Sequence, residues 1–264
     1  MSKFSDKRWI ALIVLCLGSL MIVLDTTIVN VALPSIRDDL GFTESTLAWV
    51  VNAYMLTFGG FLLLGGRLGD LFGHRKLFLM GIVLFTLASL GCGIASTQTM
   101  LIVGRAIQGF GGAIVAAVAL SLVMNLFTES GERAKAMGVY GFVNSGGGTL
   151  GVLLGGVLTN WLSWNWIFLV NLPLGILVTL LGLKLLPGHK DNGASRNLDI
   201  AGAVTITSAM LLAVYSIVNG NTVGWDSVQT LGGLAGALAI LIVFIAIELK
   251  VKAPLMPLGL FKLR

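Results

Sequence analysis

The sequence predicts an all-α integral membrane protein, built as a polytopic bundle of transmembrane helices. Of its 264 residues, 56% are hydrophobic and only 11% are charged. An average soluble domain is about 25% charged, so this composition cannot cover a globular surface with polar groups. The apolar residues also fall in runs of about 20, the length that a helix needs to cross the hydrocarbon core. Such runs lack the alternation typical of a membrane β-barrel, which leaves helices as the backbone that lipid tolerates.

Eight apolar runs follow one another along the chain, and each is predicted to be a span: 9–33, 46–66, 77–97, 99–126, 134–160, 166–187, 199–219 and 231–250. The first follows a basic N-terminus and imitates a signal peptide, but it is too long and has no A-x-A site, so we expect an uncleaved helix. The predicted organisation has four parts: a six-helix unit at 1–187, a cytoplasmic linker at 188–198, a further helix pair at 199–252, and a cytoplasmic segment at 253–264.

The positive charges predict the orientation. All Lys and Arg residues except Arg37 and Arg105 fall at the two termini, in the loops on their side, or at the ends of spans that enter those loops. Because cation-rich loops stay in the cytoplasm, we expect a multi-pass protein of the plasma membrane with both termini cytoplasmic. The net charge of +5 does not indicate nucleic acid, since no basic stripe with interleaved aromatic residues is present.

Two opposite charges lie inside predicted spans. Asp25 lies about 12 Å from the outer end of the first span, and Arg105 lies about 9 Å from the outer end of the fourth, at 1.5 Å per residue. An ionisable residue in a span is expensive and therefore indicates function. Because pairing offsets part of the desolvation cost, the two side chains are expected to meet.

The stretch around Asp25 reads LDTTIVNVALP. On a helical wheel Thr26 and Asn30 fall on the side of Asp25, and aliphatic residues cover the other side, so the polar side should face the bundle or a wet cavity. Gln108 is three residues from Arg105 and shares its face. Burial favours a neutral carboxyl group and a nearby arginine favours a charged one, so Asp25 could exchange a proton if movement changed its distance from Arg105. The alternative is a static pair that only fixes packing.

The loop GGRLGDLFGHRK, 65–76, joins two spans tightly. Gly66 and Gly73 would allow the turn and close backbone approach, and Asp70 and Arg75 could form a charge relay to a neighbouring helix. The alternative is a solvated positive loop, which leaves the glycines and Asp70 unexplained. The loop is no phosphate-binding site, because the chain has no G-x-x-x-x-G-K-[ST] motif.

The fifth predicted span carries a stripe of small residues at Gly147, Gly151 and Gly155, followed by Gly156. Spacing by four predicts a groove for another helix, either as a sliding interface or as static packing. The buried cysteines Cys16 and Cys92 lack metal-ligand spacing. No nucleophile–base or metal constellation indicates an enzyme. We therefore expect no cofactor, and a proton gradient as the driving force.

These stretches together resemble the major facilitator superfamily, and within it the fourteen-span drug:proton antiporters of the EmrB/QacA type. LDTTIVNVALP, GRLGDLFGHRK, LIVGRAIQGFGGA, GTLGVLLGGVL and SWNWIFLVNLPLG match motifs of the first helix, loop 2–3, and the fourth, fifth and sixth helices. There are departures: Val152 replaces a usual proline, which removes a kink-forming residue, and Leu71 and His74 replace usual basic residues of the loop.

The resemblance implies proton-coupled efflux of hydrophobic or cationic small molecules by alternating access. Asp25, Arg105, Asn30 and Gln108 would form the coupling site. A fourteen-span member would continue with a second six-helix half, so we expect this chain alone not to transport. The alternatives are a truncated, non-transporting membrane subunit, or an importer of a small solute.

Overall fold

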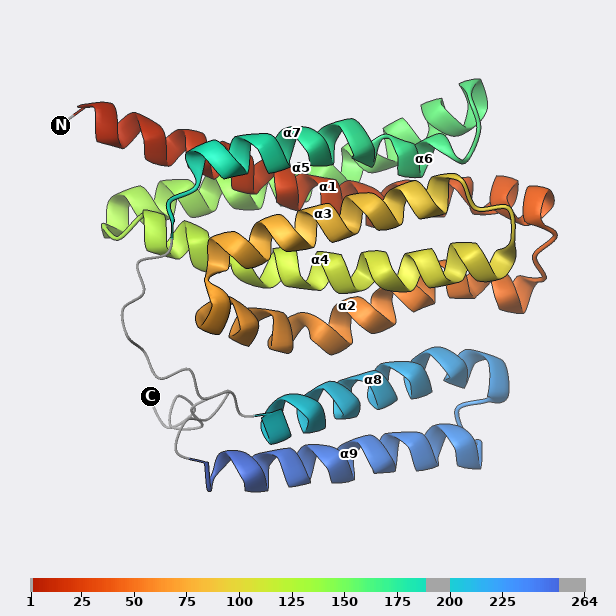
Figure 1. The fold of residues 1–264 in the computed structure, drawn as a ribbon. Helices are drawn as coiled ribbons and strands as arrows, with labels where there is room; N and C mark the ends of the chain where they lie inside the picture. The colour runs from red at the N-terminus through yellow and green to blue at the C-terminus, as the bar shows by residue number, and fades with distance from the viewer. Residues whose placement is uncertain (1, 189–199, 252–264) are drawn as a thin grey trace.

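The computed structural model describes residues 2–188 and 200–251, which form long helices lying side by side (Figure 1). The helices are α1 (Ser2–Leu40), α2 (Glu44–Phe72), α3 (His74–Gly93), α4 (Gln98–Leu126), α5 (Ser130–Trp161), α6 (Trp166–Leu169), α7 (Asn171–Leu185), α8 (Ile200–Val223) and α9 (Val228–Glu248). Within the described residues, eight stretches are long and apolar enough to cross a membrane, with α6 and α7 together forming one of them. The predicted all-α polytopic fold is therefore confirmed.

Several predicted spans differ in their bounds from the helices observed. The second is predicted to end at 66, but α2 continues to Phe72, so Asp70 lies in a helix and only Gly73 separates α2 from α3. The third is predicted to end at 97, but α3 ends at Gly93. The first is predicted to end at Leu33, but α1 continues through Pro34 to Leu40. Transmembrane helices tolerate proline because neighbouring helices and side chains satisfy the freed backbone groups. The predicted span 166–187 is divided at Val170, where α6 ends and α7 begins.

The sequence fixes several helix ends through caps. Thr43 forms a capping box with Thr46 at the start of α2, and Thr97 accepts a hydrogen bond from the Met100 N–H at the start of α4. Between α2 and α3 a single residue, Gly73, makes the turn with a φ of 92°. A side chain would be strained there, so glycine is what allows the two helices to reverse so tightly.

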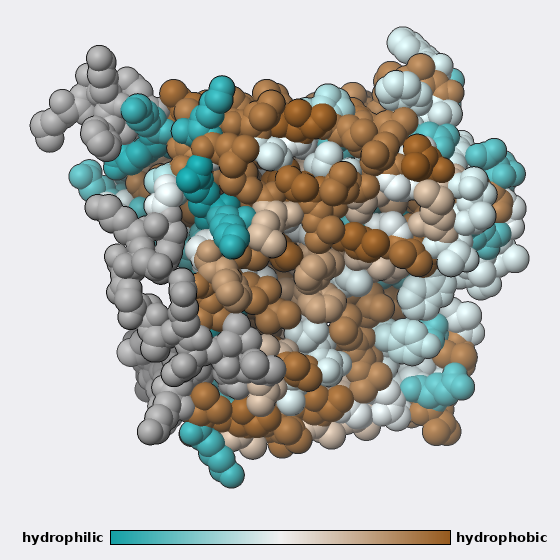
Figure 2. Space-filling view, viewed as in Figure 1, coloured by the Kyte–Doolittle hydropathy of each residue, from teal (hydrophilic) through white to brown (hydrophobic). Residues whose placement is uncertain are grey.

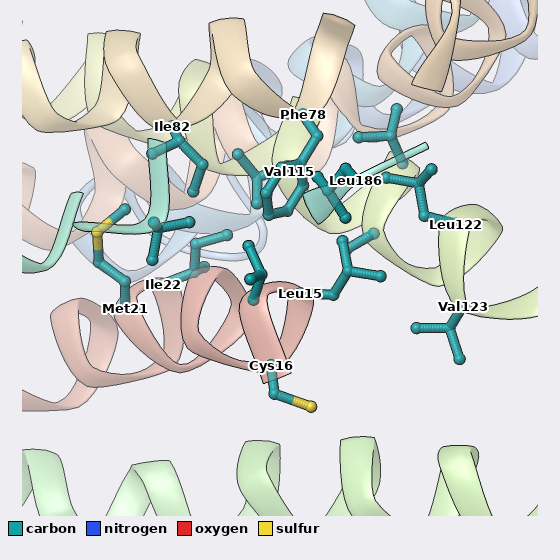
Figure 3. Packing of buried hydrophobic residues seen from close by; sticks show 14 of the residues in the cluster. Leu15, Cys16, Met21, Ile22, Phe78, Ile82, Val115, Leu122, Val123 and Leu186 are labelled. Carbon is teal, nitrogen blue, oxygen red and sulfur yellow. The ribbon is translucent and has the colours of Figure 1, made fainter. Parts of the chain in front are cut away.

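In the bundle, α4 packs against both α2 and α3, and α1 packs against α5 and α7. Helix α8 packs on α2, and α9 packs on α8 (Figure 1). An apolar core fills the space between α1, α3 and α4, as Figure 3 shows for several of its buried members: Leu15, Met21, Phe78, Ile82 and Val115. The predicted segment 253–264, and the predicted linker after Gly188, lie outside the described residues.

The start of α1 and the end of α9 lie at one end of the bundle, on the left in Figure 1. We call this the basic end, because exposed or partly exposed cations gather there: Arg8, Arg75, Lys76, Lys135, Lys184 and Lys250. At the opposite end the indole Nε1 of Trp164 donates to Asp39 Oδ2 at 2.7 Å. Figure 2 shows apolar side chains across the middle of the visible face and hydrophilic ones towards both ends.

Candidate functional site: a buried ion pair between α1 and α4

The first pair of site residues comes from α1 and from the second and third turns of α4. Asp25 is on α1 and Arg105 is on α4, and Arg105 Nη1 donates to Asp25 Oδ2 at 2.5 Å. Their side chains are only 0% and 1% exposed. The structure thus brings together the two opposite charges whose depths match in the sequence.

The other carboxylate oxygen of Asp25 is also occupied. Gln108 Nε2, from α4, donates to Asp25 Oδ1 at 3.0 Å, and Asn171 Nδ2, from the first turn of α7, donates to the same oxygen at 3.3 Å. The Ser89 hydroxyl on α3 accepts from both amides, at 2.7 Å and 3.4 Å. The carboxylate therefore accepts from three donors on α4 and α7, and Ser89 of α3 joins the cluster through the two amides.

Arg105 has its own set of partners. Its Nε donates to the carbonyl of Val50 on α2 at 2.9 Å, and its Nη1 also donates to Gln108 Oε1 at 2.9 Å. The guanidinium carbon lies 4.4 Å from the centroid of the Tyr54 ring and 5.7 Å from that of Phe168. Aromatic faces attract a cation most strongly where water is excluded. Arg105 is therefore held on α2 and α6 as well as on Asp25.

The cluster suits a charged carboxylate. Two isolated charges in the interior would each lose several kcal/mol of hydration, and a pair regains this only if further hydrogen bonds satisfy its remaining atoms. Here the amides of Gln108 and Asn171 and the backbone carbonyl of Val50 do so. An ionised carboxylate only accepts hydrogen bonds, and among the described residues each hydrogen-bond partner of Asp25 is a donor.

Asn30 does not join this cluster. Its side chain is exposed, and its Nδ2 donates to the carbonyl of Thr26 within α1 at 2.9 Å. It lies roughly 140° around the helix from Asp25, at 100° per residue, which is too far to share its neighbours. Ser89, Asn171 and Tyr54 are members that the sequence reasoning did not select. A polar side chain inside a predicted apolar span was the available signal for Ser89 and Asn171.

The residues of the predicted loop lie at the basic end, apart from the buried pair, with Asp70 in α2 and Arg75 in α3. Asp70 Oδ1 is 3.2 Å from His74 Nε2, and Asp70 Oδ2 is 3.9 Å from Arg67 Nη1. Arg75 instead donates from Nη2 to the carbonyl of Leu183, at the end of α7, at 2.5 Å. The charged groups of the loop thus hold the end of α2 to α3 and the start of α3 to α7, and His74 is a direct partner of Asp70.

Glycines let α5 approach α1 closely. A Cβ on Gly147 would lie 2.8 Å from Leu20, one on Gly155 would lie 3.0 Å from the carbonyl of Ile28, and one on Gly151 would collide with the Thr27 hydroxyl. Gly156 has open space at this position, and Gly66 has only one distant neighbour. With Val152 in place of proline, α5 runs as one helix from Ser130 to Trp161.

The comparison with known proteins gives this architecture a family. The model of the Major Facilitator Superfamily matches residues 15–260. The chain is 43% identical over 253 residues to the puromycin resistance protein pur8 of Streptomyces alboniger, covering 96% of this chain and 50% of that protein. It is 42% identical over 255 residues to the cephamycin export protein CmcT of Amycolatopsis lactamdurans, covering 96% and 52%.

A third relative, the multidrug transporter protein MdtP of Bacillus subtilis (strain 168), is 37% identical over 260 residues, which cover 98% of this chain and 48% of that protein. The chain thus spans about half the length of the curated relatives it matches. Among solved structures, the proton:xylose symporter XylE bound to 6-bromo-6-deoxy-D-glucose shares the fold, with a TM-score of 0.60 and 16% identity over 93% of this chain and 55% of that chain.

The relatives are transporters and resistance proteins rather than enzymes, in agreement with the prediction from the sequence. The helices, the apolar surface and these matches describe a multi-pass membrane protein. The chain belongs to the major facilitator superfamily.

Proposed function

We propose that the chain forms part of a proton-coupled exporter of hydrophobic or cationic small molecules in the plasma membrane, of the fourteen-span antiporter type. Its basic end would face the cytoplasm, because the cations gather there. Transporters of this kind bind their cargo where two repeats meet and rock one against the other. A second six-helix unit would therefore supply the other wall of the pathway.

One observation carries the proposal: a fully buried carboxylate that contacts only hydrogen-bond donors. A proton added to Asp25 turns one of its oxygens into a donor. The new O–H would face Arg105 on one side, or Gln108 and Asn171 on the other, and at least one of these donors would have to move away. Protonation therefore loosens α1 from α4 or from α7.

Arg105 does not lose all its partners in that step. It keeps the carbonyl of Val50 and the ring of Tyr54, so the positive charge stays on α2 and α4 while α1 is released. The α1 surface that slides is the one packed on the glycines of α5. Proton binding and helix movement are coupled because the same hydrogen bonds serve both.

The names of the relatives support export as the direction of transport. One is called a resistance protein, one an export protein and one a multidrug transporter. The identity of 37–43% to these proteins makes a related cargo class the best-supported assignment for this chain. We propose amphipathic organic molecules, cationic ones included, as that class.

The test is transport by the full-length gene product in inverted membrane vesicles, with ethidium and puromycin as probes. We expect an imposed proton gradient to drive accumulation of at least one probe, and Asp25→Asn to abolish this while the protein still reaches the membrane. Asp226→Asn removes an exposed carboxylate between α8 and α9 and is the matched control. Gradient-driven transport that survives Asp25→Asn at the level of the control would contradict the coupling role.

A further inference from the structure

A groove on the outside of the bundle runs along α3, away from the buried pair. It has a volume of about 670 Å³ and lies between α3 and its neighbours α2, α4 and α7. Its lining is almost wholly apolar and includes Leu77, Met80, Val83, Leu87, Phe110 and Leu183. Several of these side chains are about half exposed, Leu87 at 61% among them. The groove therefore faces the lipid and has the character of a binding surface for hydrocarbon.

The length of the groove matches one leaflet of a bilayer. From Leu77 to Leu87 the groove follows eleven residues of α3, whose ends are about 15 Å apart at a rise of 1.5 Å per residue. This is half of the hydrocarbon thickness, which is about 30 Å. A second hollow, between α3 and α7, shares Val83 with this groove and is also lined by Thr86 and Gly175. A single acyl chain that enters from the basic end would fill the groove and end near the middle of the membrane.

Two lysines at the basic end are sequence neighbours of residues that line this groove, although neither lysine lines it itself. Lys76 precedes Leu77 and Lys184 follows Leu183, and both leucines line the groove. The hydrogen bond from Arg75 to the Leu183 carbonyl joins the first turn of α3 to the last turn of α7, so the two lysines lie on neighbouring turns. Both are exposed, and within residues 2–188 and 200–251 neither has an acidic partner. Figure 2 shows hydrophilic groups at the left end of this apolar face.

We propose that this groove is a binding site for an anionic phospholipid, which places an acyl chain along α3 and its phosphate between Lys76 and Lys184. The apolar lining selects a lipid over a soluble phosphate compound, and the unpartnered lysines select an anionic headgroup over a zwitterionic one. A lysine near the membrane surface contributes about 1 kcal/mol to the attraction of anionic lipid, or a factor of about five in affinity. Two lysines together predict a preference of roughly 30-fold.

The site can be tested by native mass spectrometry of the detergent-solubilised 264-residue chain. The probes are dioleoyl phosphatidylglycerol, dioleoyl phosphatidylcholine with the same acyl chains, and glycerol 1-phosphate without acyl chains. We expect one phosphatidylglycerol to bind roughly 30-fold more tightly than phosphatidylcholine, and glycerol 1-phosphate not to compete. The double variant Lys76→Gln/Lys184→Gln should reduce the binding of phosphatidylglycerol to the level of phosphatidylcholine.

The matched control is Lys135→Gln/Lys250→Gln, which removes the same charge from the same end but from α5 and from the residues after α9. It should keep most of the preference. Val83→Trp, which fills the groove, should weaken the binding of both lipids. Equal affinity for the two lipids in the unmodified chain, an equal loss in the control pair, or competition by glycerol 1-phosphate would each overturn the proposal. None of these outcomes depends on transport.

Discussion

Replacing Asp25 by Asn measures how much the buried pair contributes to the stability of the bundle. The substitution keeps the shape of the side chain but exchanges one acceptor oxygen for an NH2 group. If the remaining oxygen faces Arg105, the new NH2 faces the amide donors of Gln108 and Asn171. If the side chain is flipped, the NH2 faces Arg105 itself. Either orientation opposes donor to donor and leaves a buried guanidinium without a negative partner.

Removing one partner of a buried ion pair costs about 3–5 kcal/mol. For a chain of this size that loss corresponds to a fall of roughly 10 °C in melting temperature. The assay is the apparent melting temperature of the detergent-solubilised chain. Asp38→Asn serves as control, because the side chain of Asp38 is 72% exposed and its pair with Arg37 lies at the surface, where such pairs contribute about 0–1 kcal/mol.

The double variant Asp25→Asn/Arg105→Gln measures how much free energy comes from the contact between the two side chains and how much from their other partners. If the two side chains act as one unit, the double variant should be more stable than the sum of the single effects predicts, by about 2 kcal/mol. An equal melting temperature for Asp25→Asn and the Asp38→Asn control would refute a stabilising role for the buried pair. Simple addition of the two effects would also refute it, because the contact would then contribute nothing beyond the separate side chains.

Three further substitutions and one control have expected effects on the same melting temperature. Gly151→Ala would push a methyl group into Thr27 and should cost about 1–3 kcal/mol, whereas Gly156→Ala meets nothing within 4 Å and should leave stability unchanged; equal effects would show that α5 does not pack on α1 through this stripe. Gly73→Ala, at a φ of 92°, should cost about 1–2 kcal/mol through backbone strain, and an unaltered melting temperature would refute the tight turn. Asn171→Ala removes one of the three donors to Asp25 and should cost about 1 kcal/mol; no loss would mean that this amide does not support the carboxylate.

The pairing of Asp25 with Arg105 could be predicted because a helix rises by a constant amount per residue. Two residues in antiparallel spans can therefore be assigned similar depths from the sequence alone. Depth does not specify which way a helix is rotated about its axis, however. The sequence marks Ser89 and Asn171 only as polar residues inside apolar spans; that they join this cluster depends on how α3 and α7 pack on α4 and α1.

Pro173 is the sequence feature that indicates the division between α6 and α7, although it does not interrupt the apolar run. Pro173 lies in the first turn of α7, a position where its missing N–H is no loss. A hydropathy pattern averages over such a residue and merges two helices into one span. The turn after α2 could be predicted, because glycine at position 73 is typical of a positive φ. The partner of Asp70 could not, because only the folded chain shows that the His74 side chain points towards it.

The residues of the polar cluster lie far apart in the sequence, which affects how the protein is inserted into the membrane during synthesis. Asp25 is synthesised 80 residues before Arg105 and 146 residues before Asn171. At about 5–20 residues per second, the ribosome needs roughly 4–16 s to reach the arginine. During that interval an aspartate at the centre of a newly inserted helix costs about 2.5–3.5 kcal/mol. The position of α1 in the membrane is therefore fully stabilised only after α4 has been synthesised and Arg105 can pair with Asp25.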